Sequence, residues 1–278
     1  MSAQGGLPKM TVVIPTYQQG HFIGRTIESI VSQNYPDLEL ILMDGGSSDD
    51  TMAIVERYRP HFSKIISQKD DGQADAIKRG FDMATGDIMA WCNSDDTYVP
   101  GSLLKVGAFF RDHREAQFVY GNNNIIDAND DLMVYKAQPD FNLGVMLYAY
   151  LTVPSVSAFW TRDLYQRAGG VDASFRFGMD YDLFVRMARL SAPIHSQIVI
   201  GNFRIHGDSK TSTLETVRQA EDQRIKTAYC AFGPDKPLMH RVVTTWYKGV
   251  LVWLCFKNGS LWDRLRGRWQ NNFKSVCS

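Results

Sequence analysis

The sequence predicts an α/β protein with a mostly parallel sheet flanked by helices and a helical appendage at its C-terminal end. Three observations lead to this fold class. Short apolar runs alternate with amphipathic stretches between residues 10 and 121, which is typical of β-α-β units. Two of these runs are apolar at nearly every position, as expected for strands buried on both faces. The chain from Thr213 onward has a helical pattern with one break, at Gly233 and Pro234.

The first part of the chain is interpreted element by element from this periodicity. Strands are expected at 10–17, 38–44, 63–67 and 87–92, and helices at 22–31, 51–58 and 73–84. Parallel sheets bind ligands beyond the carboxyl ends of their strands, where loops lead into helices. Three polar segments follow strand ends here and should meet at one rim of the sheet: Tyr17, Asp44, and the pair Asp95 and Asp96.

The second half has a looser pattern. The uncharged run 141–161 is about as long as a membrane-spanning helix, but its Asn, Thr, Ser and Pro residues predict a buried irregular segment instead. A second organised block follows, with a helix expected at 180–190 and a strand at 196–206.

Composition limits the functions that the chain can have. Its 278 residues, 44% apolar and 22% charged, are typical of a self-folding globular protein. The 30 basic and 30 acidic side chains cancel, which argues against a general polyanion binder, and we expect no nucleic-acid partner. The four cysteines form no CxxC pair, and MSAQGGLPK lacks the apolar core of a signal peptide. We therefore expect a cytoplasmic protein with reduced thiols.

The charges are unevenly distributed along the chain. Residues 239–278 carry seven Lys or Arg and one acid, Asp263, so this tail has a net charge of +6 and the rest of the chain −6. Four of the six tryptophans also lie in the tail: Trp246, Trp253, Trp262 and Trp269. Basic and aromatic residues are mixed in this way in segments that lie on anionic lipid. The alternative is that the aromatic residues pack on the main domain.

The loop DGGSSDDT at 44–51 has two interpretations. Asp49 or Asp50 could cap the following helix in an ordinary strand-to-helix turn. Alternatively, the Asp44 carboxylate could accept hydrogen bonds from a nucleobase or ribose. The loop is not a phosphate cradle, because it lacks the glycine spacing of the phosphate-binding motifs and its carboxylates would repel phosphate.

Two adjacent carboxylates, Asp95 and Asp96, come shortly after the strand that ends at Cys92. They would repel one another unless donors or a cation balance them. A divalent ion such as Mg²⁺ or Mn²⁺ would do so, with substrate phosphate oxygens and water completing its shell. The alternative is an ordinary turn before Pro100 and Gly101.

Further polar residues stand in the second organised block. Asp180 and Asp182 fall at an expected helix start, where the macrodipole favours acids. Because residues two apart point to different sides of a helix, at most one should face a given site, and we select Asp180, which is close to the flexible Gly178. Arg204 and His206 share one face if the chain is extended there, although a lone histidine is more often structural than a ligand.

Taken together, six segments resemble glycosyltransferases of family 2 in their order and spacing over residues 10–211. They are VVIPTY (12–17), DGGSSDDT (44–51), DDGQADAIKRGF (70–81), ATGDIMAWCNSDDTYVPGSL (84–103), GMDYDLFVR (178–186) and FRIHGDSKT (203–211). The resemblance implies the Rossmann-like fold called GT-A for residues 1–211. Within it, residues 10–121 would bind the donor and 122–211 the acceptor, and residues 212–278 would form a helical, basic, Trp-rich extension.

The resemblance also implies roles for particular residues, all by position. The donor nucleotide sugar would be bound by Pro15, Thr16, Tyr17, Asp44, Gln73, Asp75, Lys78, Asn93 and Asp95. Asp96 would be the direct ligand of Mn²⁺ or Mg²⁺, and His206 would complete the metal site. Asp95, nearer the ribose or sugar, is the third candidate metal ligand, and Asp180 would be the catalytic base.

Four positions depart from the family's usual pattern. Gly45 follows Asp44 where a second Asp is usual, Asn93 replaces the first Asp of the metal element, Met179 precedes the base in place of Glu, and Ile77 stands where many members have Arg. These changes blur the identity of the donor and suggest a subgroup of polysaccharide-building enzymes.

The expected activity is an inverting, metal-dependent transfer of a sugar from a nucleotide sugar, by default a UDP-sugar, to a hydroxyl of a glycan or lipid-linked acceptor in surface polysaccharide synthesis. The enzyme would be cytoplasmic, and peripheral on the inner face of the cell membrane if the tail binds lipid. Two rival functions are kept. A sugar nucleotidyltransferase should have a basic, Gly-rich loop near its start, but VVIPTYQQG has no Lys or Arg. A non-catalytic nucleotide- or carbohydrate-binding module would not need Asp96, Asp180 and His206 together.

Overall fold

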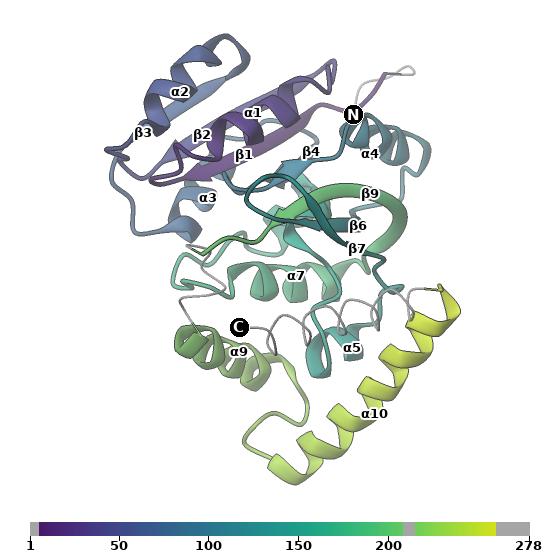
Figure 1. The fold of residues 1–278 in the computed structure, drawn as a ribbon. Helices are drawn as coiled ribbons and strands as arrows, with labels where there is room; N and C mark the ends of the chain where they lie inside the picture. Colours follow the sequence, from purple (N-terminus) through teal and green to yellow (C-terminus); the bar gives the residue numbers. More distant parts are fainter. Residues whose placement is uncertain (1–5, 208–214, 260–278) are drawn as a thin grey trace.

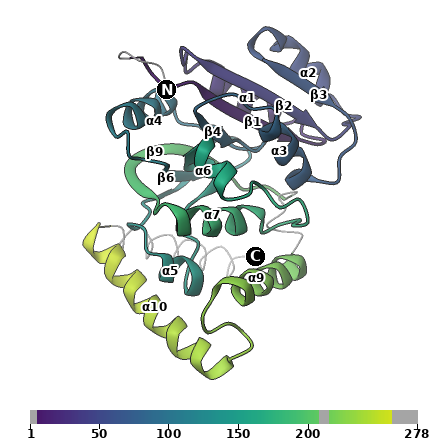
Figure 2. The same ribbon diagram turned by 180° about the vertical axis from the view of Figure 1, so that it is seen from behind.

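The structure is a computed structural model of the chain that describes residues 6–207 and 215–259. Figure 1 shows a curled sheet with helices packed on its faces. Two further helices, α9 (Glu215–Tyr229) and α10 (Pro237–Lys257), lie at the end of the molecule remote from the N-terminal strands. Figure 2 shows the same arrangement from behind.

One mixed sheet organises the molecule. Its strands are β1 (Met10–Thr16), β2 (Leu38–Asp44), β3 (Lys64–Ser67), β4 (Ile88–Trp91), β5 (Thr97–Tyr98), β6 (Phe118–Ile126), β7 (Leu132–Lys136), β8 (Ala158–Thr161) and β9 (Ile194–Arg204). They are ordered β3-β2-β1-β4-β8-β6-β9-β5, and β7 pairs with β6. The strands β3, β2, β1 and β4 run parallel to one another, whereas β8 is antiparallel to both β4 and β6.

Helices cover both faces of this sheet. Besides α9 and α10 they are α1 (Ile23–Val31), α2 (Thr51–Arg57), α3 (Gln73–Asp82), α4 (Ser102–Asp112), α5 (Leu143–Tyr148), α6 (Arg162–Arg167) and α7 (Met179–Leu190). Two short 3₁₀ turns are η1 (Arg59–His61) and η2 (Ser155–Ser157). The helix α1 buries Ile23, Ile27 and Ile30, which recur about once per turn. The helix α3 begins after Gly72, whose φ of 113° is a backbone conformation that glycine adopts without strain.

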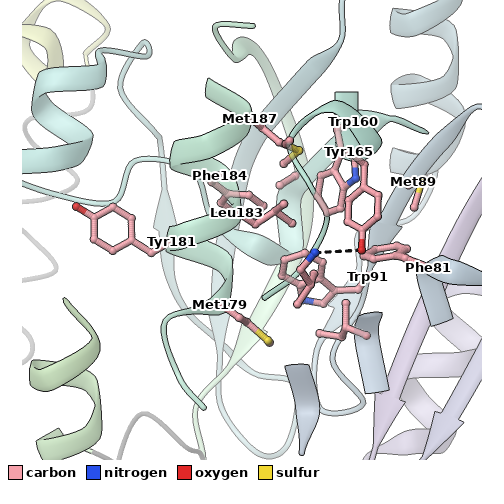
Figure 3. Packing of buried hydrophobic residues seen from close by; sticks show 14 of the residues in the cluster. Phe81, Met89, Trp91, Trp160, Tyr165, Met179, Tyr181, Leu183, Phe184 and Met187 are labelled. Carbon is pink, nitrogen blue, oxygen red and sulfur yellow. Dashed lines mark hydrogen bonds between the residues drawn. The ribbon is translucent and has the colours of Figure 1, made fainter. Parts of the chain in front are cut away.

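The central strands are buried on both faces, as the sequence predicts. Val12 and Ile14 of β1 pack into the core on one face, whereas Val13 packs with Ile41 and Met43 on the other. The second core contains a group of aromatic rings, which Figure 3 shows: Phe81, Trp91, Trp160 and Phe184. Two such cores fix the sheet in place and hold the ends of its strands rigid.

The elements predicted for residues 10–92 are confirmed, each within a few residues of its expected ends. The second half contains more regular structure than predicted. The segment 141–161, which was expected to be irregular, contains α5 and β8. With 6 and 4 residues, these elements are too short for periodicity to reveal. Strand β6 was also missed, because it contains three consecutive Asn residues and Asn is uncommon in strands.

The C-terminal helices are separated by a turn that contains Gly233 and Pro234, as predicted. Trp262, Trp269 and the basic residues after Lys257 lie outside the described residues. Cysteines in the described ranges are free thiols, as expected from their spacing. None of the helices in those ranges is both long enough and apolar enough to cross a bilayer.

Candidate functional site

The carboxyl ends of β1, β2 and β4 lie at one rim of the sheet. β1 pairs in parallel with both neighbours, with Thr16 opposite Asp44 and Val13 opposite Trp91. Pro15 and Thr16 are buried at the end of β1. Because each predicted polar segment begins where one of these strands ends, the structure brings the three segments to the same rim.

The first two loops of the rim are joined by hydrogen bonds. The backbone N–H of Gln18 donates to Ser47 Oγ at 2.8 Å, and that of Gly20 donates to Asp49 Oδ2 at 2.9 Å. Asp49 also accepts from the backbone N–H and the hydroxyl of Thr51, the first residue of α2. The N-cap residue of that helix is Asp50, and its side chain makes no capping hydrogen bond. Burial alone would raise the pKa of Asp49, but these hydrogen bonds hold it below its ordinary value.

Asp44 is buried at the base of the same loop. Its carboxylate accepts from the backbone N–H groups of Gly46 and Ser47 and from the hydroxyls of Ser47 and Ser67, at 2.5–3.2 Å. The two hydroxyls can rotate, so that a donor group of a ligand could replace either of them. The ring of Tyr17, by contrast, is 60% exposed where β1 ends. The rim therefore combines a buried acceptor with an open aromatic face.

A series of side chains connects α3 to the loop after β4. Gln73, the first residue of α3, donates from Nε2 to Asn93 Oδ1 at 2.7 Å. Asn93 in turn donates from Nδ2 to Asp96 Oδ2 at 3.1 Å. Three of the residues predicted to form the site are thus in direct contact.

Asp75 and Lys78, the other predicted donor-binding residues of α3, form ion pairs along the helix. Asp75 lies 3.6 Å from Arg79, and Lys78 lies 2.8 Å from Asp82. Each partner stands four residues further along, toward the end of α3 that is remote from Gln73. The structure therefore brings Gln73 to the loop after β4 and directs Lys78 away from it.

Asp95 and Asp96 are in different environments. Asp96 is 1% exposed, and its carboxylate accepts the backbone N–H of Arg204 at 2.9 Å as well as the Asn93 amide. Burial, together with the charge of Asp95, raises the pKa of Asp96 well above its ordinary value. Asp95 stays partly exposed, and its Oδ2 lies 3.1 Å from His206 Nε2. Of the two carboxylates predicted as metal ligands, the geometry presents Asp95 beside His206, whereas Asp96 holds the loop itself.

Arg204 fastens this loop to the end of β9. Its buried guanidinium donates to the carbonyl of Asp95 at 2.7 Å and pairs with Asp130 at 2.5 Å. The same group lies 5.1 Å from the centre of the Phe22 ring, against which the His206 ring packs at 4.6 Å. The shared face predicted for Arg204 and His206 is confirmed by these common contacts.

Asp95 and His206 form a donor pair that suits a divalent cation. Mn²⁺ accepts imidazole and carboxylate ligands, and Mg²⁺ or Mn²⁺ often takes only one or two protein ligands and completes its shell with substrate phosphates and water. Within residues 6–207 and 215–259, no group of three or more His, Cys, Asp or Glu side chains could enclose an ion. The residues present therefore fit an ion that a bound diphosphate helps to hold.

Helix α7 runs antiparallel to β4, so that its first turn lies where β4 ends. Phe184 of α7 stacks on Trp91 of β4 with ring centres 5.7 Å apart. In Figure 3, Met187 lies on the same side of this contact as Met89, and Met179, in the first turn of α7, lies on the opposite side. The N-terminus of α7 is therefore directed toward the loop that follows β4.

Asp180 is placed at this N-terminus. It precedes Phe184 by one helical turn, about 6 Å, and Asn93 follows the end of β4 by about 7 Å. Its carboxylate accepts the backbone N–H of Tyr181 at 2.7 Å. Protein atoms surround the carboxyl, although part of the residue still reaches solvent. This burial, assisted by the charge of Asp222 in α9, raises the pKa of Asp180 to about 6.

Asp182 lies on a different side of α7 from Asp180, as helical spacing predicts. It is buried and pairs with Arg186 at 2.6 Å. Its other oxygen accepts the hydroxyl of Tyr229 in α9 at 3.1 Å. Asp182 therefore joins α7 to α9 and has a structural role.

Glu221 of α9 holds the segment just before Asp180, and sequence patterns do not identify it. Its carboxylate accepts the backbone N–H groups of Arg176, Phe177 and Gly178 at 2.7–2.8 Å, in the segment that leads into α7. One carboxylate thus fixes the backbone immediately before Asp180. Because Glu221 is 45 residues from Arg176 and lies in a largely polar helix, no local signal marks it.

Comparison with known proteins places the chain among glycosyltransferases. The profile of the family described as glycosyl transferase family 2 matches residues 11–162. A PGL/p-HBAD biosynthesis glycosyltransferase of Mycobacterium bovis is 29% identical over 183 residues, which cover 64% of this chain and 69% of the relative. An uncharacterized glycosyltransferase of Rickettsia prowazekii is 25% identical over 230 residues, 77% of this chain and 70% of the relative.

Solved structures share the fold. S. aureus TarS 1–349 in complex with UDP-GlcNAc has a TM-score of 0.61 and 19% identity, covering 79% of this chain and 66% of that one. The mannosyltransferase PcManGT of Pyrobaculum calidifontis, in complex with GDP-Man and Mn²⁺, has a TM-score of 0.60 and 17% identity, covering 98% and 80%. A longer TarS chain is matched over 42% of its length. At these identities the likeness is one of fold.

The family match spans more than half of the chain and includes the ends of β1, β2 and β4. The relatives are named glycosyltransferases, and the fold that the solved structures share with this chain is GT-A. The chain therefore belongs to glycosyl transferase family 2 and is a glycosyltransferase with the GT-A fold.

Proposed function

We propose that the protein is a metal-dependent, inverting glycosyltransferase that moves a sugar from a nucleotide sugar to a hydroxyl of a glycan or lipid-linked acceptor in surface polysaccharide synthesis. One observation carries the proposal. Asp95, in the loop after β4, lies beside His206, which follows β9, and the N-terminus of α7, with the carboxyl of Asp180, is directed toward the same loop. The pair can bind a cation, and the carboxyl can accept a proton. This reaction requires both a bound cation and a proton acceptor.

The nucleotide of the donor would lie over the ends of β1 and β2. Tyr17 offers an open ring beside Pro15 and Thr16, and Asp44 offers a carboxylate whose serine partners can rotate to admit a ribose or base. The complex of TarS with UDP-GlcNAc supports a UDP-sugar as the default donor, and the complex of PcManGT with GDP-Man supports a GDP-sugar as the second candidate.

The sugar and diphosphate would lie over α3 and the loop after β4. Gln73 and Asn93 are in contact there and present amide groups to a sugar hydroxyl. Asp75 and Lys78 remain predictions, because both pair with residues further along α3 and Asp75 also accepts the backbone N–H of Asp71 just before the helix. Asp95 and His206 would hold Mn²⁺ or Mg²⁺, which when bound would neutralise the charge of the leaving diphosphate. The Mn²⁺ in the PcManGT complex supports this assignment.

Asp180 would act as the general base. Its carboxylate would take the proton of the acceptor hydroxyl while that oxygen forms a bond to the anomeric carbon and the bond from this carbon to the diphosphate breaks. A single displacement of this kind inverts the anomeric configuration. A carboxyl with a pKa of about 6 is ionised at neutral pH and is more basic than an exposed one.

The acceptor end of the molecule would meet the membrane. The sequence from 239 to 278 has a net charge of +6 and four tryptophans, a composition that favours an anionic lipid surface. We therefore include a cytoplasmic, peripheral position on the inner face of the cell membrane in the proposal, together with a lipid-linked acceptor.

The proposal is tested by measuring the thermal stability of the protein with a panel of nucleotides and nucleotide sugars, with Mn²⁺, with Mg²⁺ and with excess chelator. A true donor at about 100 times its Kd should add about 2.7 kcal/mol to the free energy of unfolding. Chelator, or Asp95→Ala, should abolish most of this gain. Asp37→Ala, an exposed aspartate before β2, is the matched control and should keep it.

A sugar-release assay separates the rival functions. The transferase should consume a nucleotide sugar slowly even with water as acceptor, and a binding module should not. A nucleotidyltransferase should instead form a nucleotide sugar from a nucleoside triphosphate and a sugar phosphate. Stabilisation that is unchanged by chelator and by Asp95→Ala would contradict the role of the metal.

A further inference from the structure

Helix α10 has two faces of different character. Its inner face packs on α5: the Tyr247 ring stacks on Tyr148 at 5.4 Å, and Leu254 is buried. The approach is so close that a Cβ at Gly144 would overlap the Tyr247 ring. The helix is therefore fixed to the protein along one side only.

The outer face of α10 is apolar and exposed. Trp246 and Phe256 are each 71% exposed, and Leu238 is 75% exposed. We call this surface the α10 face and define it by six residues: Leu238, Val242, Trp246, Val252, Trp253 and Phe256. Five of the six recur at spacings of three, four or seven residues, so they form one stripe along the helix. A continuous exposed apolar surface of this kind marks an interaction site.

The charges beside the stripe indicate the partner. From 237 to 259 the sequence has no Asp or Glu, and it has Arg241, Lys248 and Lys257. All three are exposed, and the Lys257 ammonium lies 5.7 Å from the centre of the Trp253 ring. Tryptophan and phenylalanine flanked by cations complement a lipid interface with anionic headgroups, where aromatic rings and apolar side chains enter the acyl boundary and Lys and Arg stay with the phosphates.

The position of the α10 face agrees with this partner. Figures 1 and 2 both show α10 at the end of the molecule opposite α2 and the strands β1 to β3. Its neighbour α5 contacts α7, because the hydroxyl of Tyr181 donates to the carbonyl of Met146 at 3.0 Å. The helix that carries Asp180 is therefore two packing contacts away from the α10 face.

We propose that the α10 face is a membrane-docking surface that lies in the interface of an anionic bilayer, with the helix axis in the plane of the membrane. In this position Asp180 would be on the side of the enzyme nearer to the lipid. The inference rests on the membrane partner of the proposed function, but it needs none of the proposed chemistry.

The test is flotation of the full chain with vesicles of phosphatidylglycerol and phosphatidylcholine, and with vesicles of phosphatidylcholine alone. Wild type should float with the mixed vesicles. The double variant Trp246→Glu/Trp253→Glu should partition at least about tenfold more weakly. Arg241→Glu/Lys248→Glu should lose the preference for anionic lipid and the dependence on salt. Leu132→Glu, at an exposed leucine of β7, is the matched control and should behave as wild type.

Several outcomes would overturn the proposal. One is that wild type does not float, and another is that the tryptophan double variant floats as well as wild type. A third is that wild type is a dimer in sedimentation equilibrium and the double variant is a monomer. That result would assign the α10 face to a second copy of the chain. Circular dichroism checks that each variant is folded. Stabilisation of the same variants by nucleotide sugars with Mn²⁺ should equal that of wild type. If nucleotide sugars with Mn²⁺ do not stabilise wild type, the proposed donor and metal are contradicted, but the flotation result still stands.

Discussion

At the scale of single residues, three aspartates near the rim differ in what surrounds them. Asp96 is buried and accepts hydrogen bonds on both oxygens, Asp95 stays partly exposed beside His206, and Asp180 is enclosed at the start of a helix. The same side chain therefore holds a loop, lies beside a histidine, or carries a raised pKa. Burial and hydrogen bonding, and not residue type, separate these roles.

The first prediction concerns Asp180 as the base. Asp180→Asn should lower transfer by about 10²- to 10⁴-fold, the usual contribution of a general base, and leave donor binding in calorimetry unchanged. In wild type the rate should rise with pH through about 6, because the base acts only when ionised. Asp222→Asn removes the neighbouring charge from α9 and should move this midpoint to lower pH. A rate that does not change across this range would exclude Asp180 as the base.

The second prediction concerns stability. Because the pKa of Asp180 is about 6 in the folded protein and about 3.8 when unfolded, the folded state binds this proton more tightly. Stability is therefore lost as pH rises between these values, at 1.36 kcal/mol per pKa unit, or up to about 3 kcal/mol. Since the residue reaches solvent, we expect Asp180→Asn to raise the free energy of unfolding at neutral pH by about 1–2 kcal/mol. Urea unfolding should show the gain disappearing below about pH 4, and a gain that persists there would contradict this cause.

At the scale of elements, α9 holds the start of α7. Glu221 accepts three backbone N–H groups before the helix, and Tyr229 of the same helix donates to Asp182. Helix starts carry donors without intrahelical partners, and here a side chain from another element satisfies donors just ahead of the first turn. The direction of Asp180 is therefore set in part by a helix that follows the family match in sequence.

The third prediction is that Glu221→Ala lowers the free energy of unfolding by about 2 kcal/mol, because it leaves three backbone donors without their charged partner. It should also lower kcat by about tenfold with little change in the KM of the donor, because a displaced base affects the chemical step more than nucleotide binding. Glu221→Gln keeps one acceptor oxygen and should recover part of both losses. Glu115→Ala, at an exposed residue after α4, is the control and should have neither effect. If Glu221→Ala instead raises the KM of the donor and leaves kcat normal, Glu221 belongs to the donor site.

Elements were predictable where local periodicity was strong. The apolar runs of β1 and β2 and the apolar stripe of α1 can be recognised from the sequence, because the two strands are buried in the sheet and the helix buries one side against it. The short α5 and the Asn-rich β6 are stabilised by contacts distant in sequence and could not be predicted locally. The same limit applies to the site. The acidic pair after β4 could be identified from the sequence. Which of the two carboxylates faces His206 could not, because it depends on a hydrogen bond from the backbone of Arg204 to Asp96, 108 residues away.

At the scale of the whole molecule, the sequence suggests a boundary near residue 211, but α9 packs as part of the main body. Ile225 is 1% exposed and lies in the same core as Phe175, Met179 and Tyr181. The α10 helix and its exposed stripe, at the far end of the molecule, are attached through α5. The GT-A core and α9 are therefore expected to unfold together.

The last prediction tests this cooperativity. Ile225→Ala should lower the free energy of unfolding by about 3 kcal/mol, as much as Ile27→Ala in the helix α1, because both remove a fully buried side chain from a packed core. Val242→Ala, on the exposed stripe of α10, should cost less than about 0.5 kcal/mol. Denaturant unfolding with hydrogen exchange provides the readout: amides of β1 and β4 should lose as much protection in Ile225→Ala as those of α9, because they open in one global transition. Faster exchange confined to α9 would instead make this helix an independent appendage, with the domain boundary before it.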